Sequence, residues 1–424
     1  MRILYSLAIN LYTLAIRIVT PFHRKARLMV RGWHDAWQRM NQCFDTPSSQ
    51  PTLWFHTSSL GEFEQARPVL ESVRKQHPNY RIVVTFFSPS GYEVRKNYNQ
   101  ADLVLYLPPD TRRNASRLVR LIQPTTVFFV KYDFWFNYME ALHRQQIPTY
   151  VISAIFRPSQ YFFRWYGRWF RRQLACCFDH IFVQNDESLQ LLQQHGITRC
   201  TRTGDTRFDR VNAIANQAQR FPEVERYLSL HEGAAVVVAG SSWPPDEQHI
   251  ARFRARHPLP HIVWILAPHL INEGHLTDIE RRFGVDRCVR YSLTDHCDDE
   301  RLANSDVMIV DNIGMLSSLY RYAYVACVGG GFGVGIHNTL EAVTFGKPVL
   351  FGPNYGKFQE AHDLLACGGG FTFHSDEELE KVLVTLLTDE QSYKKASDAC
   401  LSYVADNVGS SRIILNHVFP ETAQ

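Results

Sequence analysis

Short apolar runs alternate with longer segments of helical spacing through the first half of the chain. The runs are rich in β-branched and aromatic residues, and the segments between them are long enough to form helices. This alternation is typical of βαβ units, in which successive strands lie parallel in one sheet. The predicted strands cover residues 52–56, 81–87, 102–107, 126–132, 148–153 and 180–184.

A second series of the same kind fills the rest of the chain. It predicts strands at residues 235–240, 261–268, 286–291, 306–311, 323–330 and 348–352. We therefore predict an α/β fold of two Rossmann-like domains facing a cleft, with ligands at the carboxyl ends of the strands. The predicted domains are an N-terminal anchor and basic linker at 1–45, a first domain at 46–206 and a second at 207–424.

The N-terminal residues form an element of their own. Residues 3–16 carry no charge, and Arg17 and a basic stretch at 23–31 follow them. This run is shorter than the roughly 20 residues that a spanning helix needs. It predicts a membrane anchor, either a short span or a helix in the membrane plane, with its basic flank on the cytoplasmic side. A buried first helix of the domain is the alternative.

Charge and cysteine content narrow the class of protein. Lys and Arg total 45 against 42 Asp and Glu, so the net charge of +3 gives no general affinity for nucleic acid. The nine cysteines include no CxxC pair and no zinc-ligand spacing, which indicates reduced thiols rather than a metal site. Residues 161–172, YFFRWYGRWFRR, favour contact with an anionic membrane surface over stacking on nucleic acid bases.

The first candidate for chemistry follows the strand predicted at 52–56. Ser59 and Glu62 have the spacing of a capping box, in which each side chain binds a free backbone N–H at the start of a helix. The same Glu62, on a turn from strand to helix, is also placed to take a proton from a substrate. Gly61 favours the second interpretation, because glycine opens the turn to a substrate and is a poor helix former.

A second candidate lies at the end of the strand predicted at 126–132. Lys131 and Asp133 come directly after an apolar stretch and stand among aromatic residues, where unpaired charges are costly to bury. Binding of a polar headgroup would give them partners. A contact between Lys131 and Asp133 themselves is the alternative.

In the second half, five glycines fall within residues 329–335, the last of them Gly335. His337 and Asn338 then open a predicted helix that has Glu341 in its first turn. Glycines let a backbone approach a ligand closely, and a helix N-terminus attracts phosphate, so this stretch predicts a nucleotide-sugar site. Asn338 and Glu341 also fit a capping box.

Two more predicted strand ends belong to the same edge of the second sheet. Ser241 and Ser242 follow one strand, and Pro268 and His269 follow the next. Ordinary turns between strand and helix would explain each pair separately. Together they line the side of the sheet where ligands bind.

Taken in order, these stretches resemble the family of 3-deoxy-D-manno-octulosonic acid (Kdo) transferases that act on lipid A precursors. The resemblance rests on five stretches in the family's order, which span nearly the whole chain. They are S-x-G-E at residues 59–62, D-x-W-x-N at 133–137, GDTRFD at 204–209, GSSW at 240–243, and H-N-x-x-E at 337–341 followed by GKPVLFGPNYGKFQEA at 346–361.

The resemblance implies a GT-B glycosyltransferase whose N-terminal domain holds the acceptor and whose C-terminal domain holds the nucleotide sugar. Such enzymes move Kdo from CMP-Kdo to a lipid A precursor, lipid IVA, at the cytoplasmic face of the inner membrane. They invert the anomeric centre and use no catalytic metal or other cofactor, and no protein partner is implied.

The resemblance also assigns roles to residues. Glu62 is the expected general base, and the expected acceptor-binding residues are Ser59, Gly61, Lys131 and Asp133. The expected donor-binding residues are Arg207, Ser241, Ser242, Pro268, His269, Gly335, His337, Asn338 and Glu341.

The sequence departs from the family pattern at three places. Lys131 stands where many members carry an acidic residue, and Met315 stands where a glutamate is usual. The A-P-R-H element reads Ala-Pro-His-Leu here, so the arginine expected to bind the donor phosphate is missing. Arg207 or Lys357 would replace it.

Two other functions fit the same features. One is a GT-B enzyme that uses a UDP-sugar, as a transferase or an epimerase. The other is a non-catalytic peripheral protein that binds lipid headgroups, for which Glu62 would have no chemical role.

Overall fold

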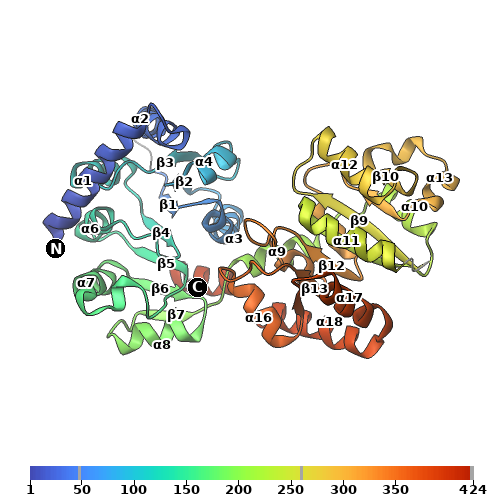
Figure 1. Cartoon of the computed structure of the whole chain (residues 1–424). Helices are drawn as coiled ribbons and strands as arrows, with labels where there is room; N and C mark the ends of the chain where they lie inside the picture. Colours follow the sequence, from blue (N-terminus) through green and yellow to red (C-terminus); the bar gives the residue numbers. More distant parts are fainter. Residues whose placement is uncertain (46–48, 258–260, 421–424) are drawn as a thin grey trace. The chain divides into compact units, whose positions relative to one another are not determined.

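The computed structural model describes residues 1–45, 49–257 and 261–420, which form two compact units. The first unit comprises residues 1–210 together with the chain from residue 407 onwards, and the second comprises residues 211–406 (Figure 1). The sequence placed residues 207–424 in one domain, so the C-terminal segment differs from that expectation. The predicted boundary at 45/46 adjoins residues 46–48, which lie outside the described residues.

The first unit is built on a seven-stranded parallel sheet in the order β3-β2-β1-β4-β5-β6-β7. Each of the six predicted strands forms close to its expected position, and β7 is added at the edge. The strands are β1 (Thr52–Thr57), β2 (Arg81–Phe86), β3 (Leu103–Tyr106), β4 (Thr126–Val130), β5 (Thr149–Ala154), β6 (His180–Val183) and β7 (Cys200–Arg202).

Both faces of this sheet are covered, as the near-continuous apolar sequences of its strands require. The helices of the unit are α1 (Arg2–Val19), α2 (Arg24–Phe44), α3 (Leu60–Gln76), α4 (Pro89–Arg95), α5 (Arg112–Ile122), α6 (Phe136–Arg144), α7 (Arg168–Cys177), α8 (Asp186–Gln194), α9 (Arg207–Asn216), which continues into the second unit, and α19 (Ser410–Val418). Within β1, Trp54 joins the core shared with α2, α5 and α6, while Leu53 and Phe55 join the core shared with α3 and α19.

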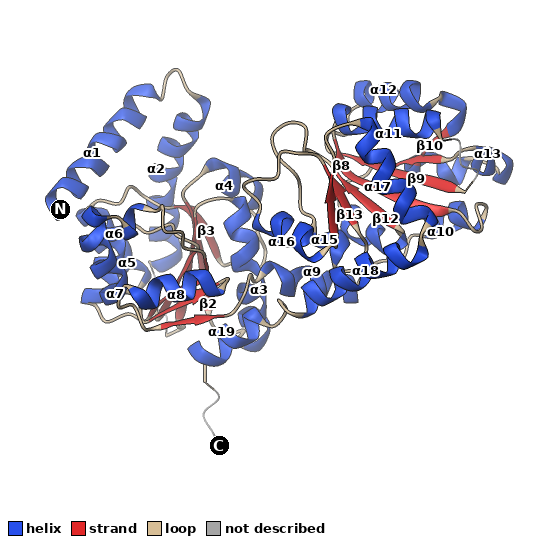
Figure 2. Ribbon diagram, turned by 60° about the horizontal axis from the view of Figure 1, so that its bottom comes forward, coloured by secondary structure: helices blue, strands red, loops and turns tan. Residues whose placement is uncertain are grey.

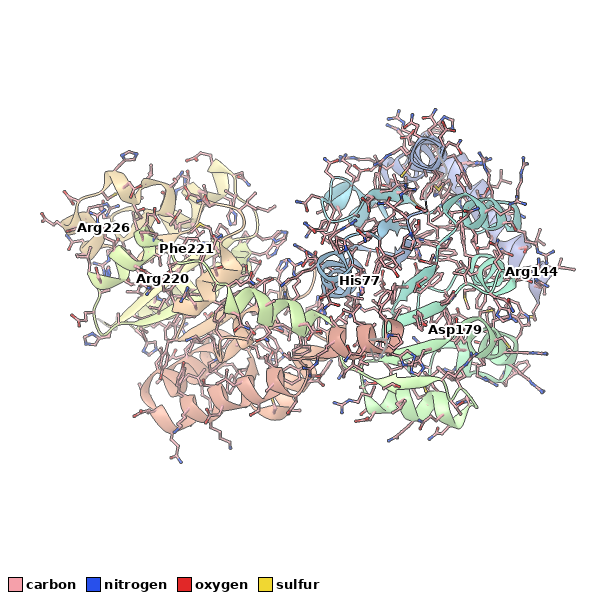
Figure 3. All side chains as sticks on the ribbon, turned by 180° about the vertical axis from the view of Figure 1, so that it is seen from behind. His77, Arg144, Asp179, Arg220, Phe221 and Arg226 are labelled. Atoms are coloured by element: carbon pink, nitrogen blue, oxygen red, sulfur yellow. The ribbon has the colours of Figure 1, made fainter. Side chains whose placement is uncertain are left out.

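The chain returns to the first unit through α19 because that helix has an apolar face to bury there. Ile414 and Leu415 lie in the core with α3, and the ring of Phe419 packs against His77 at 5.0 Å between centroids (His77 is labelled in Figure 3). The Asp209 carboxylate accepts hydrogen bonds from the N–H groups of Gly409 and Ser411 at 2.5 and 2.6 Å. These contacts explain why residues from 407 onwards do not belong to the second unit.

The second unit repeats the architecture with a seven-stranded parallel sheet in the order β10-β11-β9-β8-β12-β13-β14. Helices lie on both faces of it (Figure 2). The strands are β8 (Ala235–Ser242), β9 (Ile262–Pro268), β10 (Cys288–Arg290), β11 (Val307–Ile309), β12 (Val325–Val328), β13 (Val349–Phe351) and β14 (Gly370–Thr372). The helices are α10 (Pro222–Ser229), α11 (Pro244–Arg256), α12 (Glu273–Phe283), α13 (Asp299–Asn304), α14 (Leu316–Leu319), α15 (Leu340–Val343), α16 (Gln359–Cys367), α17 (Asp376–Thr388) and α18 (Glu390–Ala405).

The N-terminal helix α1 is long and apolar enough to cross a membrane, with a mean hydropathy of 1.4 over residues 2–19. It also packs on the first unit through one side, where Thr13 is buried and Tyr5 meets Phe136 and Trp169. Its other side is apolar and exposed. That side carries Ile3, Leu4, Leu7, Leu11, Leu14 and Ile18, each more than half exposed.

The placement of α19 can be tested with two adjacent isoleucines. Ile414→Ala should lower the free energy of unfolding by about 2–4 kcal/mol, because it opens a cavity in the core shared with α3. Ile413→Ala is the matched control, since Ile413 is 44% exposed, and it should cost less than about 1 kcal/mol. Denaturant unfolding of both variants measures the difference, and equal losses would contradict this placement.

Candidate functional site

The sequence-predicted residues of the first unit gather where the order of its strands reverses. β1 and β4 are neighbours in the sheet although β2 and β3 come between them in the chain. Such a reversal separates the two following loops and leaves a crevice at the carboxyl ends of the strands. Ser59, Gly61 and Glu62 follow β1, and Lys131 and Asp133 follow β4.

Glu62 is a capping residue, as one of the two interpretations required. Its Oε2 accepts hydrogen bonds from the Ser59 backbone N–H at 2.8 Å and from the Ser59 hydroxyl at 3.1 Å, and Ser59 is the N-cap of α3. Both bonds use Oε2, and within the described residues Oε1 has no hydrogen-bond donor. One carboxylate oxygen therefore caps the helix start, while the other makes no capping contact.

The surroundings of Glu62 favour proton uptake. Burial raises the pKa of Glu62, and the nearby charge of Asp133 raises it further. The Lys131 ammonium and the two hydrogen bonds from Ser59 act in the opposite direction without reversing the shift. The backbone around Gly61 is open, since an added Cβ there would meet only the Ser59 hydroxyl, at 4.0 Å. Glu62 thus has the raised proton affinity of a general base and an open approach.

Asp133 is held by the buried His56 and the partly buried Trp135, and the sequence predicted neither contact. Its Oδ2 lies 2.7 Å from His56 Nε2 and accepts a hydrogen bond from Trp135 Nε1 at 3.1 Å. His56 is fully buried near the end of β1, and its Nδ1 lies 2.9 Å from the Thr85 hydroxyl on β2. The alternative considered from the sequence, a contact between Lys131 and Asp133, is not what fixes this carboxylate. A histidine inside the apolar run 52–56 was the one sequence signal for the network.

Lys131 adopts a backbone conformation that is rare for residues other than glycine. Its φ is +60°, and its N–H donates to the Ile152 carbonyl at 3.0 Å. A residue held in this region costs free energy that the surrounding fold must offset, and such positions cluster at functional sites. The charge of Lys131 acts on both Glu62 and Asp205.

Arg207 lies in the first unit, not in the second as the predicted boundary placed it. Its guanidinium forms an ion pair with the buried Asp205, with Nε and Nη2 at 3.0 and 2.8 Å from Oδ2. The same Asp205 oxygen accepts a hydrogen bond from Gln65 on α3. Arg207 therefore has a structural partner that the sequence did not reveal.

The remaining predicted residues gather at the corresponding point of the second unit. β8 and β12 are adjacent, and the strand order reverses between them. The residues that follow β12 fold back over the end of β8, with the Gly329 N–H donating to the Gly240 carbonyl at 2.9 Å. Ser241 has a φ of +50°, so this reversal point also holds a strained residue that is not glycine.

Three aromatic rings form one stack at this edge. The ring of His269 lies 4.7 Å from that of Trp243 and 4.5 Å from that of His337, nearly parallel to both. Trp243 Nε1 donates a hydrogen bond to His337 Nε2 at 3.1 Å, which requires that nitrogen to be unprotonated. Burial lowers the pKa of His337, and the neighbouring His269 lowers it further. The stack brings together the ends of β8 and β9 and the loop after β12.

Ser242 and Pro268 make structural contacts at this edge of the sheet. The Ser242 hydroxyl donates to the buried Glu247 at 2.9 Å, and the Ser242 carbonyl accepts the N–H of His269. Pro268 ends β9, where it pairs with Ser242. Ser242 is almost fully buried, so its hydroxyl serves the fold.

The glycine-rich loop is more structural than the sequence predicted. An added Cβ at Gly329 would come within 2.3 Å of the Ser241 carbonyl, and one at Gly331 within 2.5 Å of the Gly352 backbone. Gly335 has a φ of +118° and faces Phe358. Close packing of the loop therefore explains much of the glycine density that the sequence attributed to a ligand.

The helix expected to open at His337 begins later. α15 starts at Leu340 and is four residues long. Asn338 accepts the Leu340 N–H at 3.2 Å and donates to Glu341 at 2.9 Å, so these two side chains bind each other across the turn. So short a helix contributes only a small dipole, and the predicted attraction of phosphate to its N-terminus loses most of its physical basis.

Comparison with known proteins finds sequence similarity to one group of enzymes. The family model described as "3-Deoxy-D-manno-octulosonic-acid transferase (kdotransferase)" matches residues 32–210. The 3-deoxy-D-manno-octulosonic acid transferase of Aquifex aeolicus is 26% identical over 350 residues, covering 81% of this chain and 87% of the relative. The enzyme of the same name from Chlamydophila psittaci is 26% identical over 360 residues, covering 83% and 81%.

Solved structures agree on the fold. The UDP-GlcNAc 2-epimerase of Neisseria meningitidis, bound to UDP-GlcNAc, superposes with a TM-score of 0.60 at 15% identity over 87% of this chain and 99% of that one. At this identity the likeness concerns only the GT-B arrangement of two parallel-sheet domains. The curated relatives match over more than four fifths of the chain, so the similarity to Kdo transferases extends along most of its length.

Proposed function

We propose that this protein is an inverting, metal-independent transferase that moves Kdo from CMP-Kdo to a lipid A precursor such as lipid IVA. The observation that carries the proposal is the Glu62 carboxylate, held with a raised pKa beside Asp133 at the strand reversal of a Kdo transferase fold. A base at this place suits the attack of a sugar hydroxyl, which must lose a proton as it forms the new bond.

The reaction proposed is a single displacement. The acceptor hydroxyl oxygen attacks the anomeric carbon of Kdo, the bond from that carbon to the CMP phosphate breaks, and Glu62 Oε1 takes the hydroxyl proton. Attack from the side opposite the leaving group inverts the anomeric centre. CMP leaves with the bonding electrons as a stable phosphate monoester, so orientation of the two substrates supplies a large part of the rate.

The second unit is the proposed donor site. The stack of Trp243, His269 and His337 gives a flat aromatic surface with exchangeable ring protons at the strand reversal. His269 occupies the place where the family carries arginine, so an imidazole replaces a guanidinium as the proposed contact to the donor phosphate. Ser241, Gly335, Asn338 and Glu341 remain proposed donor contacts on the same edge.

The proposed site of action is the cytoplasmic face of the inner membrane. The exposed apolar side of α1 fits a helix lying in the membrane plane, because its other side is taken up by packing on the first unit. The segment predicted to touch lipid adds exposed aromatic rings, with Trp165 90% exposed and Tyr166 50% exposed. Both features support association with an anionic membrane surface.

Mass spectrometry of the acceptor tests the proposed function. Incubation of the full chain in detergent with CMP-Kdo and lipid IVA should add one or more Kdo residues to the lipid, and the product ladder counts them. The same yield is expected after EDTA treatment. Parallel incubation with UDP-GlcNAc is the control, since fold neighbours bind that nucleotide sugar. Lipid of unchanged mass with CMP-Kdo, or transfer only from UDP-GlcNAc, would contradict the proposal.

Glu62→Gln separates the chemical role of this residue from its capping role. We expect the transfer rate to fall by about 10²–10⁴-fold, because the amide cannot accept the proton. The amide oxygen can still accept the Ser59 N–H. Because folding raises the pKa of Glu62, it disfavours the ionised form, so the neutral amide should cost less than about 1 kcal/mol of stability at neutral pH.

The wild-type rate should also fall as the pH decreases through the raised pKa of Glu62, since the protonated acid is no longer a base. Glu71→Gln on the same helix is the matched control, because Glu71 pairs with Arg67 on α3. A Glu62→Gln enzyme with the rate of the Glu71→Gln enzyme would rule out the base assignment.

A further inference from the structure

The N-terminal helix α1 contacts α6 through an ion pair and an aromatic pair. Arg2 forms an ion pair with Glu140, which also pairs with Arg144 at 2.8 Å (Arg144 is labelled in Figure 3). One turn further along α1, the ring of Tyr5 packs edge-on against Phe136 at 5.2 Å between centroids. The apolar helix is thus joined to α6 by both charge and packing.

The Tyr5 hydroxyl belongs to a hydrogen-bond network around one buried carboxylate, that of Asp110. It donates to Asp110 Oδ2 at 2.6 Å, and the same carboxylate accepts the N–H groups of Asn137 and Tyr138 at 3.1 and 3.0 Å. Asp110 is 2% exposed, and its burial raises its pKa to about 6. Because those two N–H groups belong to the first turn of α6, Asp110 caps this helix from outside, and Tyr5 satisfies the capping carboxylate.

The capped turn carries the loop of the proposed acceptor site. Trp135 is the N-cap residue of α6, and its Nε1 donates to Asp133 Oδ2 at 3.1 Å. Any shift in the first turn of α6 therefore moves the indole that holds Asp133. Asp133 in turn raises the pKa of Glu62.

A second chain of contacts leads from α1 to the same indole. The ring of Tyr12 stacks on Phe87 at 6.3 Å, and Phe87 packs on Trp135 at 4.7 Å between centroids. The cavity left under α1 at this place has a volume of only 10 Å³, about the space of one water. Trp135 is thus supported from α1 at two places.

We infer that Tyr5 is a positioning residue for the transfer reaction: α1 holds the Asp133–Trp135 loop in its working geometry as well as holding the protein on the membrane. This inference rests on the proposed function. A membrane anchor alone would need only the exposed side of α1, whereas Tyr5 and Tyr12 lie on the side that meets the first unit. The Tyr5 hydroxyl donates to the buried Asp110, and membrane binding does not require this hydrogen bond.

Tyr5→Phe tests the inference, because it removes the hydroxyl and keeps the ring on Phe136. The matched control is Tyr12→Phe, which keeps the stacking on Phe87 and removes a hydroxyl with no hydrogen bond in the described part of the chain. Both full-length variants are assayed in detergent with CMP-Kdo and lipid IVA, so that delivery to a membrane does not limit the rate. Flotation with liposomes is measured separately.

We expect Tyr5→Phe to lower kcat by about tenfold, as misplacement of a reacting group does, while flotation and the KM for CMP-Kdo stay at wild-type values. Tyr12→Phe should match wild type in all three. With 5-fluorotryptophan incorporated, the ¹⁹F resonance of Trp135, assigned with Trp135→Phe, should shift in Tyr5→Phe and not in Tyr12→Phe. A purely structural role for Tyr5 would lower the melting temperature and leave kcat unchanged.

Wild-type kcat in Tyr5→Phe, or an unmoved Trp135 resonance, would overturn the inference. A loss of flotation together with full activity in detergent would also overturn it, since Tyr5 would then serve only the anchor. These outcomes differ from failure of the proposed function, in which the wild-type protein itself would transfer no Kdo. The assay on wild type therefore decides the function first.

Discussion

The adjacency of β1 and β4 is the constraint on which the proposed chemistry depends. Parallel pairing brings their carboxyl ends to one edge, and each strand delivers a carboxylate there, Glu62 from the first and Asp133 from the second. Like charges in a partly buried setting raise the cost of ionising both groups. Asp133 does not turn away to relieve this, because His56 and Trp135 hold it.

The two units share two structural features at the points where their strand orders reverse. Each has a residue other than glycine at positive φ there, Lys131 in the first and Ser241 in the second. Each also supports its edge with a hydrogen bond between an indole and an imidazole or carboxylate, from Trp135 or Trp243. Strained backbone and hydrogen-bonded rings at matching positions suit the proposal that both edges bind ligands.

Much of the fold could be predicted from the sequence, because strands buried on both faces are continuous apolar runs. The two strands that were missed, β7 and β14, are three-residue edge strands, and only the pairing with a neighbour defines them. The return of α19 was also missed, since the apolar face of a helix does not say which core will bury it. The contacts of Ile414 with α3 decided this.

The placement of the candidate residues after strand ends was predicted from the sequence, and their contacts only partly. The residues at strand ends were found because turn chemistry after an apolar run is visible in sequence. The partners that set their behaviour lie far away in the chain, as His56 does from Asp133 and Tyr5 from Asp110. Spacing could not separate a capping role of Glu62 from a chemical one, because Oε2 alone makes both capping hydrogen bonds and leaves Oε1 without a donor among the described residues.

The proton affinity of Glu62 is the quantity on which the account rests, and carbon NMR measures it directly. In protein labelled with ¹³C at the glutamate carboxyl groups, the Glu62 signal is assigned by its loss in Glu62→Gln and followed as a function of pH. The account predicts a pKa above the ordinary glutamate value, and a lower pKa in Asp133→Asn. A pKa at or below the ordinary value, unchanged in Asp133→Asn, would contradict it.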